Sequence, residues 1–338
     1  MPAFLQIPEE LAPVQQMLGA GLARVQRRFD EQLASDLLPV ERLCRHVEHY
    51  RGKMLRPMLV MLSGLACGDR EISEEHVTIA AVCEMVHMAT LVHDDVLDEA
   101  ENRRRGRTVN HLYGNEAAVI LGDYLIAGAY HLCTSLDSVE AARRIGEVSM
   151  VLCAGELLQL HFRDDYSLDE ATYFEILERK TAALIGVACR LGAALAGARP
   201  ALCEAMEAFG RRLGVAFQIQ DDLLDLTGEE AVVGKSVGKD LEKGKLTLPV
   251  LIRLADLAPA ERGRFLALLE GASAAGEEAR AAAGRLRREL ESSGAIARAT
   301  ERAAGLVAEA RAHLGALPAG PARDMLDLMA RAVVDRRS

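Results

Sequence analysis

Apolar residues recur every three or four positions along most of the chain, and this period is typical of helices that bury one face. No stretch alternates convincingly between apolar and polar residues, as a half-buried strand would. The pattern predicts helices over 9–35, from Pro39 to about Tyr50, from Met58 to about Cys67, and from Ser73 to the first acidic motif described below. Further helices are expected to begin at Glu116, Asp137, Leu168, Lys180 and Pro200. The chain beyond about Leu251 is also expected to be helical, with breaks at Gly294 and 318–321. Charged or Gly- and Lys-rich loops are expected at 101–108 and 228–244. No low-complexity linker divides the chain, so we expect one large all-α helical bundle, a single domain over 1–338.

Composition supports this picture and excludes some partners. The chain has 338 residues, of which 50% are hydrophobic and only 4% are aromatic, and this balance favours helices over sheets. The formal net charge of −10 argues against binding to nucleic acid or to an anionic membrane surface. Seven scattered cysteines indicate a reduced, cytoplasmic setting. The N-terminus lacks the features of a signal peptide, and no apolar run approaches the roughly 18 residues of a membrane span, so no transmembrane segment is expected.

Two aspartate-rich pentads carry most of the functional information. Asp94-Asp95-Val96-Leu97-Asp98 and Asp221-Asp222-Leu223-Leu224-Asp225 each place carboxylates at i, i+1 and i+4. On a helix the first and last carboxylates share a face, where they repel one another unless a cation lies between them. One such pentad is explained equally well as a solvated acidic face. Two of them, each in an apolar helical stretch and each followed by clustered cations, predict Mg²⁺ sites that face a shared cavity.

Basic residues cluster beside the acidic ones. They are Lys53 and Arg56, then Arg103, Arg104 and Arg105, and finally Lys235, Lys239, Lys243 and Lys245. Carboxylates that hold Mg²⁺ and cations that neutralise the remaining oxygens are what recognition of a polyphosphate requires. Most Lys and Arg residues in any chain are ordinary solvated charges, and that explanation stays open for each cluster taken alone.

Five motifs in order resemble those of the trans-isoprenyl diphosphate synthases, the polyprenyl synthetase family. They are Gly52-Lys53-Met54-Leu55-Arg56-Pro57, the first pentad with Arg103-Arg104, Lys180-Thr181, Phe217-Gln218 with the second pentad, and the Gly- and Lys-rich segments 234–241 and 244–249. The resemblance covers about 45–255. It implies an all-α bundle around a deep central cavity, a homodimer, and head-to-tail prenyl transfer from an allylic prenyl diphosphate to isopentenyl diphosphate.

The resemblance also implies roles for individual residues. Asp94 and Asp98 would bind two Mg²⁺ ions and Asp221 a third, and Mn²⁺ could replace them. Asp95, Asp222 and Asp225 would support the shell of bound water around these ions. The allylic diphosphate would be held by Arg103, Lys180, Thr181, Gln218, Lys235 and Lys245. Isopentenyl diphosphate would be held by Lys53, Arg56, His87 and Arg104, although a histidine on an apolar helix face, such as His87, is more often a core residue.

The chemistry fits these roles. Mg²⁺ and cations stabilise a departing diphosphate, so the allylic carbon–oxygen bond can ionise, and the double bond of isopentenyl diphosphate then attacks the carbocation. No nucleophilic side chain is needed. Asp94, Asp98, Asp221, Lys180 and Lys235 are therefore the expected catalytic residues.

Small residues upstream of the first pentad indicate a long product. In the family that this sequence resembles, bulky aromatic residues four and five positions before the first aspartate stop chain growth early. Those positions are Thr90 and Ala89 here, which predicts a long-chain, all-trans product in the hexa- to octaprenyl range. Ordinary core packing is the alternative explanation for both residues.

Three other functions are alternatives to synthesis. A terpene cyclase would share the fold and the first acidic motif, but it usually lacks the basic motif around Lys53. A metal-dependent phosphohydrolase is suggested by His93-Asp94, but it leaves the second pentad unexplained. A non-catalytic synthase subunit typically loses one acidic motif, and both are intact here.

Overall fold

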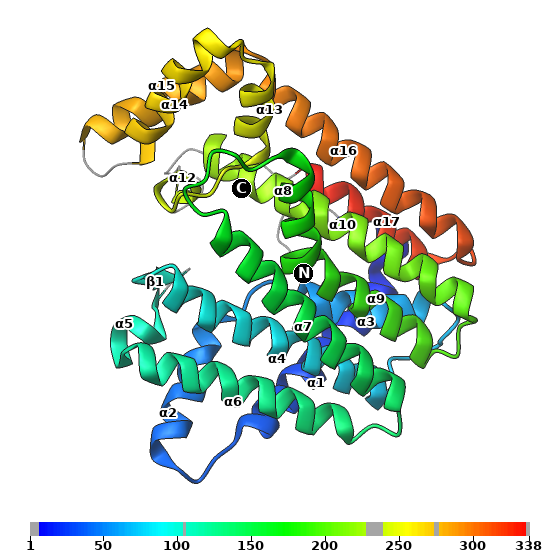
Figure 1. Cartoon of the computed structure of the whole chain (residues 1–338). Helices are drawn as coiled ribbons and strands as arrows, with labels where there is room; N and C mark the ends of the chain where they lie inside the picture. Colours follow the sequence, from blue (N-terminus) through cyan, green and yellow to red (C-terminus); the bar gives the residue numbers. More distant parts are fainter. Residues whose placement is uncertain (1–6, 104–105, 228–238, 274–276, 336–338) are drawn as a thin grey trace. The chain divides into compact units, whose positions relative to one another are not determined.

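The computed structural model describes residues 7–103, 106–227, 239–273 and 277–335 (Figure 1). The chain forms two compact units, and each is described by itself. The first contains Met1–Met150, Leu184–Gly210 and His313–Leu328, and the second contains Val151–Ala183, Arg211–Ala312 and Met329–Ser338. The expected sites at Arg104 and Lys235 lie outside the described residues, as do Arg105, Gly234 and Gly238.

Helix α4 (Glu74–Leu97) lies at the core of the first unit. It packs against α1 (Ala12–Leu33), α3 (Leu55–Ala66), α5 (Val109–Tyr113) and α6 (Asn115–Thr134). Most of its residues from His76 to Val92 are buried, because neighbours cover it on several sides, and this explains its nearly continuous apolar sequence. Its N-cap is Ser73, whose hydroxyl accepts from the backbone N–H of His76 at 3.3 Å. The other helices that lie wholly or partly in this unit are α2 (Leu38–Val47), α7 (Val139–His161), α9 (Ala183–Leu195), α10 (Pro200–Thr227) and α17 (Pro321–Val334).

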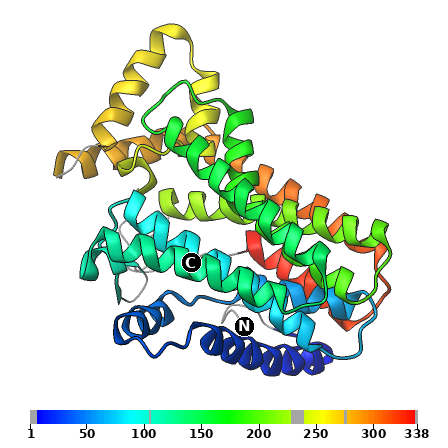
Figure 2. The same cartoon turned by 60° about the horizontal axis from the view of Figure 1, so that its bottom comes forward.

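The second unit contains the C-terminal parts of α7, α10 and α17 and several shorter helices. These are α8 (Glu170–Leu177), α12 (Lys239–Glu242), α13 (Leu248–Asp256), α14 (Pro259–Ser273), α15 (Glu277–Ser292) and α16 (Ala295–His313). Helices α14 and α15 lie side by side in both views (Figures 1 and 2). Helix α13 packs against α8 and α15. Arg253 of α13 donates to Glu289 of α15 at 2.6 Å, which ties these helices together.

The structure confirms the all-α fold and differs from the expected elements in two places. The charged segment 101–108 contains a two-stranded antiparallel hairpin of β1 (Asn102–Arg103) and β2 (Gly106–Arg107), with Asn102 opposite Arg107. No helix begins at Lys180. Instead a π-helical turn, Glu178–Ala182, joins α8 to α9 in one continuous helix.

Two helices are long and apolar enough to cross a membrane by length and composition alone, α4 and α6. In α4, 78% of the apolar window is buried within the structure, as in the core helix of a globular protein, and in α6 39% is buried. One or two such helices are weak evidence for a membrane span.

Candidate functional site

The first pentad forms the C-terminal end of α4. Asp98 is the C-cap of this helix, and its backbone N–H donates to the carbonyl oxygen of Asp94 at 2.8 Å. Asp94 and Asp98 therefore lie one turn apart, and both side chains are partly exposed. Asp95 points the other way and is only 1% exposed. The helix thus presents two carboxylates outward and buries the third.

Asp95 is held by residues from two other segments. Arg103 of the hairpin donates from Nε to Asp95 Oδ1 at 2.8 Å, and the hydroxyl of buried Tyr50 lies beside the same carboxylate. That hydroxyl also accepts from the backbone N–H of Val109 at 2.9 Å. Burial raises the pKa of Asp95, and the Arg103 guanidinium opposes this effect. Arg103 is thus placed at the first pentad, and Tyr50 joins the pentad to the turn that carries the basic motif.

The basic motif lies just before and within the first turn of α3. Lys53 is exposed, and Met54 adopts a left-handed conformation (φ 54°) as the N-cap of α3. Arg56 is half-buried, and its guanidinium is close enough to Cys83 of α4 to oppose the rise in the pKa of that thiol that burial causes. His87, also half-buried, follows Cys83 by one helical turn, so Arg56 and His87 border the same face of α4.

The expected chain-length residues are buried in α4. Ala89 is fully buried, whereas Thr90 is half-buried and donates from Oγ1 to the carbonyl oxygen of His87 at 2.8 Å. Met85 lies one turn deeper and approaches α6, where a Cβ atom on Gly128 would come within 2.8 Å of its Cε. The flexible side chain of Met85 therefore lies between α4 and α6, one turn before Ala89.

The π-helical turn places the central motif of the second unit. A π-turn adds one residue to a helical turn and recurs at functional sites. Here it carries Lys180, which forms an ion pair with Glu156 of α7, and Thr181. Gly155 of α7 allows the close approach, because a Cβ at this position would lie 2.8 Å from the backbone nitrogen of Lys180.

The second pentad repeats the arrangement of the first. Asp221 and Asp225 are partly exposed and lie one turn apart on α10, whereas Asp222 is 6% exposed. Asp222 accepts from the hydroxyl of Tyr173 at 2.7 Å and from Gln218 Nε2 at 3.0 Å, and Gln218 Oε1 accepts from Thr181 Oγ1 at 3.2 Å. Each pentad therefore buries its second aspartate beside a tyrosine hydroxyl.

Burial controls the charge of this second pentad. It raises the pKa of Asp222 well above its ordinary value, and the neighbouring carboxylate of Asp240 adds to the rise. Asp225 Oδ2 accepts from the backbone N–H of Asp240 at 3.1 Å, which holds α12 against the end of α10.

A cavity of about 120 Å³ opens beside these residues, entirely within the second unit. Its polar walls come from five elements, namely α7, α8, the π-turn, α10 and the segment 240–247. They include five of the residues discussed here, Lys180, Thr181, Gln218, Asp222 and Lys245, together with Asp240 and the previously unassigned Gln159, Tyr173 and Thr247. The apolar walls are Phe162, Leu168, Ile176, Leu177 and Leu246. Cations, carboxylates and an apolar surface thus line one cavity.

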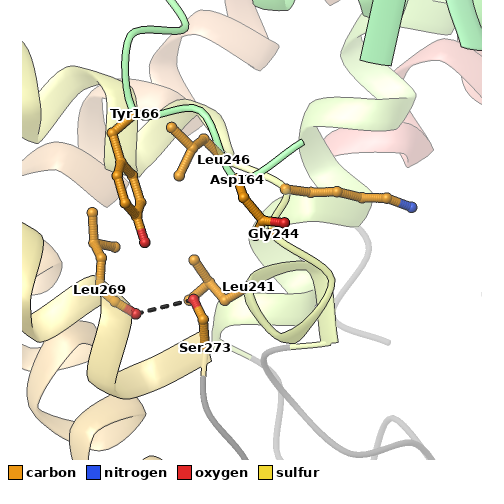
Figure 3. Close-up of a pocket in the computed structure, with 8 residues that line it drawn as sticks. Asp164, Tyr166, Leu241, Gly244, Leu246, Leu269 and Ser273 are labelled. Carbon is orange, nitrogen blue, oxygen red and sulfur yellow. Dashed lines mark hydrogen bonds between the residues drawn. The ribbon is translucent and has the colours of Figure 1, made fainter. Parts of the chain in front are cut away.

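The turn that carries Lys245 is fastened to the connection between α7 and α8. Asp164 donates from its backbone N–H to the carbonyl oxygen of Gly244 at 3.0 Å, and its carboxylate lies against the Cα of Gly244 (Figure 3). Both residues have left-handed backbones, with φ of 60° and 67°. Figure 3 shows this contact in a small pocket that Tyr166, Leu241 and Leu269 also line.

The outward carboxylates of the two pentads suit Mg²⁺ that is bound together with a polyphosphate. Among the described residues, no group of three or more His, Cys, Asp or Glu side chains forms a complete metal cage. Mg²⁺ seldom uses such a cage, because it keeps several waters and binds through one or two carboxylates and the substrate's phosphates. The outward pairs Asp94 with Asp98 and Asp221 with Asp225 supply donors of this kind.

Tyr50, Tyr173, Gln159 and Thr247 belong to the two sites and were not expected from the sequence. Tyr173 could have been found, since it lies seven residues, or about two helical turns, before Lys180. Tyr50 lies two residues before the basic motif, and Thr247 lies inside the motif 244–249. Gln159 carries no recognisable signal.

Comparison with known proteins assigns the family. The sequence model of the polyprenyl synthetase family matches residues 39–286. The octaprenyl diphosphate synthase of Escherichia coli is 38% identical over 241 residues, which are 71% of this chain and 74% of that protein. The nonaprenyl diphosphate synthase of Mycobacterium tuberculosis is 35% identical over 317 residues, covering 94% of this chain and 92% of its own.

Solved structures agree with this assignment. A polyprenyl synthase from Caulobacter crescentus, complexed with calcium and isoprenyl diphosphate, has a TM-score of 0.88 and 33% identity, and covers 98% of this chain and 100% of its own. A decaprenyl diphosphate synthase from Rhodobacter capsulatus has a TM-score of 0.87 and 34% identity, covering 97% and 99%. The fold and the family match define an enzyme that transfers prenyl groups. The chain belongs to the polyprenyl synthetase family.

Proposed function

We propose that this chain synthesises a long-chain, all-trans polyprenyl diphosphate by adding isopentenyl diphosphate, head to tail, to an allylic prenyl diphosphate. The observation that carries the proposal is the cavity of the second unit, where Lys180 and Lys245 line the same space as Asp222 and Gln218. Relatives named as octaprenyl and nonaprenyl diphosphate synthases support the long product.

The proposed roles divide the site into three groups. Asp94, Asp98 and Asp221 bind three Mg²⁺ ions, which Mn²⁺ can replace, and Asp95, Asp222 and Asp225 support the water around them. Arg103, Lys180, Thr181, Gln218, Lys235 and Lys245 hold the allylic diphosphate. Lys53, Arg56, His87 and Arg104 hold isopentenyl diphosphate.

When bound, Mg²⁺ supplies Lewis-acid stabilisation of the diphosphate leaving group. The chain's own residues supply position and charge. Lys180 and Lys245 neutralise diphosphate oxygens as charge moves onto them, and the hydrogen bonds from Thr181 through Gln218 to Asp222 fix this wall of the cavity before the substrate arrives. Phe162, Ile176 and the other apolar walls exclude water, which would otherwise quench the allylic carbocation. The departed diphosphate accepts the proton that the new carbon chain loses.

Purified protein tests the proposal directly. It is incubated with Mg²⁺, isopentenyl diphosphate and farnesyl or geranylgeranyl diphosphate, and the products are separated by chromatography. We expect a long prenyl diphosphate, and we expect its formation to stop with a chelator and to resume with Mg²⁺. A cyclic hydrocarbon would instead indicate a terpene cyclase, nucleotide hydrolysis without isopentenyl diphosphate would indicate a phosphohydrolase, and no product at all would indicate a non-catalytic subunit.

The proposed assembly is a homodimer. Helices α5 and α6 pack against each other and expose several apolar residues, namely Leu112 (46%), Tyr113 (48%), Val119 (42%), Ile120 (66%) and Tyr130 (37%). Exposed apolar side chains that form a patch usually mark contact with another molecule. A second copy of the chain would cover these side chains.

We propose that the protein acts in the cytoplasm.

A further inference from the structure

Two polar groups in the cavity of the second unit differ from their neighbours. Gln159 Nε2 and Thr247 Oγ1 are buried, and within the described residues neither has a hydrogen-bond partner. Tyr173, Thr181, Gln218 and Asp222, which line the same cavity, are joined in one chain of hydrogen bonds. The cavity therefore contains polar atoms that the protein itself satisfies and two that it does not.

The side chain of Thr247 does not cap helix α13, although the residue stands at the N-cap position. It is the N-cap of α13 and only 2% exposed, yet its side chain makes no capping hydrogen bond. A threonine at an N-cap ordinarily accepts from the backbone N–H of the second or third helical residue. The second is Pro249, which has no N–H, and the N–H of Val250 donates to the backbone carbonyl of Thr247 at 3.0 Å. The hydroxyl is therefore not committed to the helix.

A buried polar group that has no partner at all would reduce the stability of the protein. A buried donor that has lost water and gained no partner carries a desolvation cost, and an apolar side chain of the same shape would avoid it. A molecule that enters the cavity could form the hydrogen bonds that Gln159 and Thr247 lack, and this would explain why both residues are polar.

The chemistry of the walls defines the occupant. The Gln159 amide nitrogen can only donate, and the Thr247 hydroxyl can donate, so both match an oxygen that accepts. Lys180 and Lys245 line the same cavity, and the N-terminal end of α13 favours negative charge. Asp222 and Asp240 also line it and would repel a bare anion. A diphosphate accompanied by a divalent cation satisfies all of these groups.

We infer that Gln159 and Thr247 are binding residues for the allylic diphosphate, each donating a hydrogen bond to one of its oxygens. This inference rests on the proposed function and adds two residues to its diphosphate site. The substrate, when it binds, would supply the hydrogen bonds that both donors lack.

The test compares stability with binding in Gln159→Leu and Thr247→Val, which keep side-chain size and remove the donors. Thermal unfolding without ligand is measured first, and then the affinity for inorganic pyrophosphate with excess Mg²⁺ by titration calorimetry. We expect an unchanged or higher unfolding temperature and about tenfold weaker pyrophosphate binding for each variant, with a similar rise in the KM for farnesyl diphosphate. The KM for isopentenyl diphosphate should not change.

Thr78→Val is the matched control. Thr78 is equally buried in the first unit, but its hydroxyl accepts from Arg28 Nη1 at 2.9 Å. This variant should unfold at a lower temperature and bind pyrophosphate like the parent. If Gln159→Leu and Thr247→Val behave like this control, their polar groups are structural or hold a permanent water, and the inference is wrong.

Two further outcomes separate this inference from the proposed function. A parent enzyme that elongates prenyl chains while both variants bind pyrophosphate normally refutes the inference alone. A parent that binds pyrophosphate through both residues but makes no prenyl product refutes the proposed function and leaves the diphosphate site intact. Absence of pyrophosphate binding by the parent overturns the inference whatever its activity.

Discussion

The hydroxyl of Tyr173 on α8 donates to Oδ2 of Asp222 on α10 at 2.7 Å, in a region from which solvent is almost excluded. Replacing Tyr173 with Phe leaves a buried carboxylate oxygen without this donor. We expect the free energy of unfolding to fall by about 1–3 kcal/mol. Because Asp222 adjoins the proposed metal ligand Asp221, kcat should fall by roughly 10–100-fold, as for other residues that orient metal ligands. Chemical denaturation and steady-state kinetics measure both effects, and unchanged kcat in a destabilised variant would limit Tyr173 to a structural role.

Alanine at the outward carboxylates tests the metal sites. Asp94→Ala and Asp221→Ala each remove a donor that the proposed Mg²⁺ ions share with the diphosphate. We expect the rate of prenyl elongation to fall by roughly 10²–10³-fold or more. Asp36→Ala, in the exposed connection between α1 and α2, is the control and should elongate at the parental rate. Elongation at parental speed in both site variants would contradict the proposed mechanism.

Two glycines of α7 form a matched pair for the Lys180 turn. An added Cβ at Gly155 would lie 2.7 Å from Arg179 Cβ and 2.8 Å from the Lys180 nitrogen, whereas at Gly146 it would meet nothing within 4 Å. We expect Gly155→Ala to cost about 1–3 kcal/mol and to reduce activity, since the turn must move. Gly146→Ala should stabilise the protein by up to about 1 kcal/mol and leave kinetics unchanged. Thermal unfolding and prenyl transfer assays compare them, and equal effects would contradict the close-contact explanation.

Ala89→Phe tests whether the growing chain passes along α4. Ala89 is fully buried, so a phenylalanine there fills either substrate space or packed core. If it fills substrate space, the product should become shorter and the unfolding temperature should change little. If it overpacks the core, the protein should lose about 1–3 kcal/mol with the product length unchanged. Chromatography of the products and thermal unfolding distinguish the two results.

Ile120→Glu tests the proposed homodimer. This α6 residue is 66% exposed, and a charge in a covered apolar interface would be strongly unfavourable. We expect the variant to be monomeric by light scattering at a concentration where the parent is dimeric. Leu37→Glu, at a position that is 61% exposed but lies between α1 and α2, should leave the dimer intact. Equal masses for the parent and the Ile120 variant would exclude α6 as the interface.

Sequence periodicity was sufficient to predict the all-α fold, because helices such as Ala12–Leu33 are long enough to show several turns of pattern. It missed the hairpin at Asn102–Arg107, since strands of two residues contain no measurable alternation. It also placed a helix start at Lys180, because a π-turn shifts the phase of an otherwise continuous helix.

The metal-binding and cationic residues were predicted from spacing within single segments. The contacts that support them join distant segments, as Tyr173 and Asp222 do across 49 positions, and spacing alone does not specify such pairs. The prediction that the two pentads face a shared cavity stays a prediction, as do the roles of Arg104 and Lys235.

The contact between Asp164 and Gly244 holds together two stretches of backbone that are far apart in sequence. A side chain at position 244 would overlap the carboxylate of Asp164 and would be strained by the left-handed backbone there, with φ of 67°. Any movement of the turn that carries Lys245 would therefore carry the 164 stretch with it. A covalent cross-link between the two stretches would accordingly leave turnover unchanged.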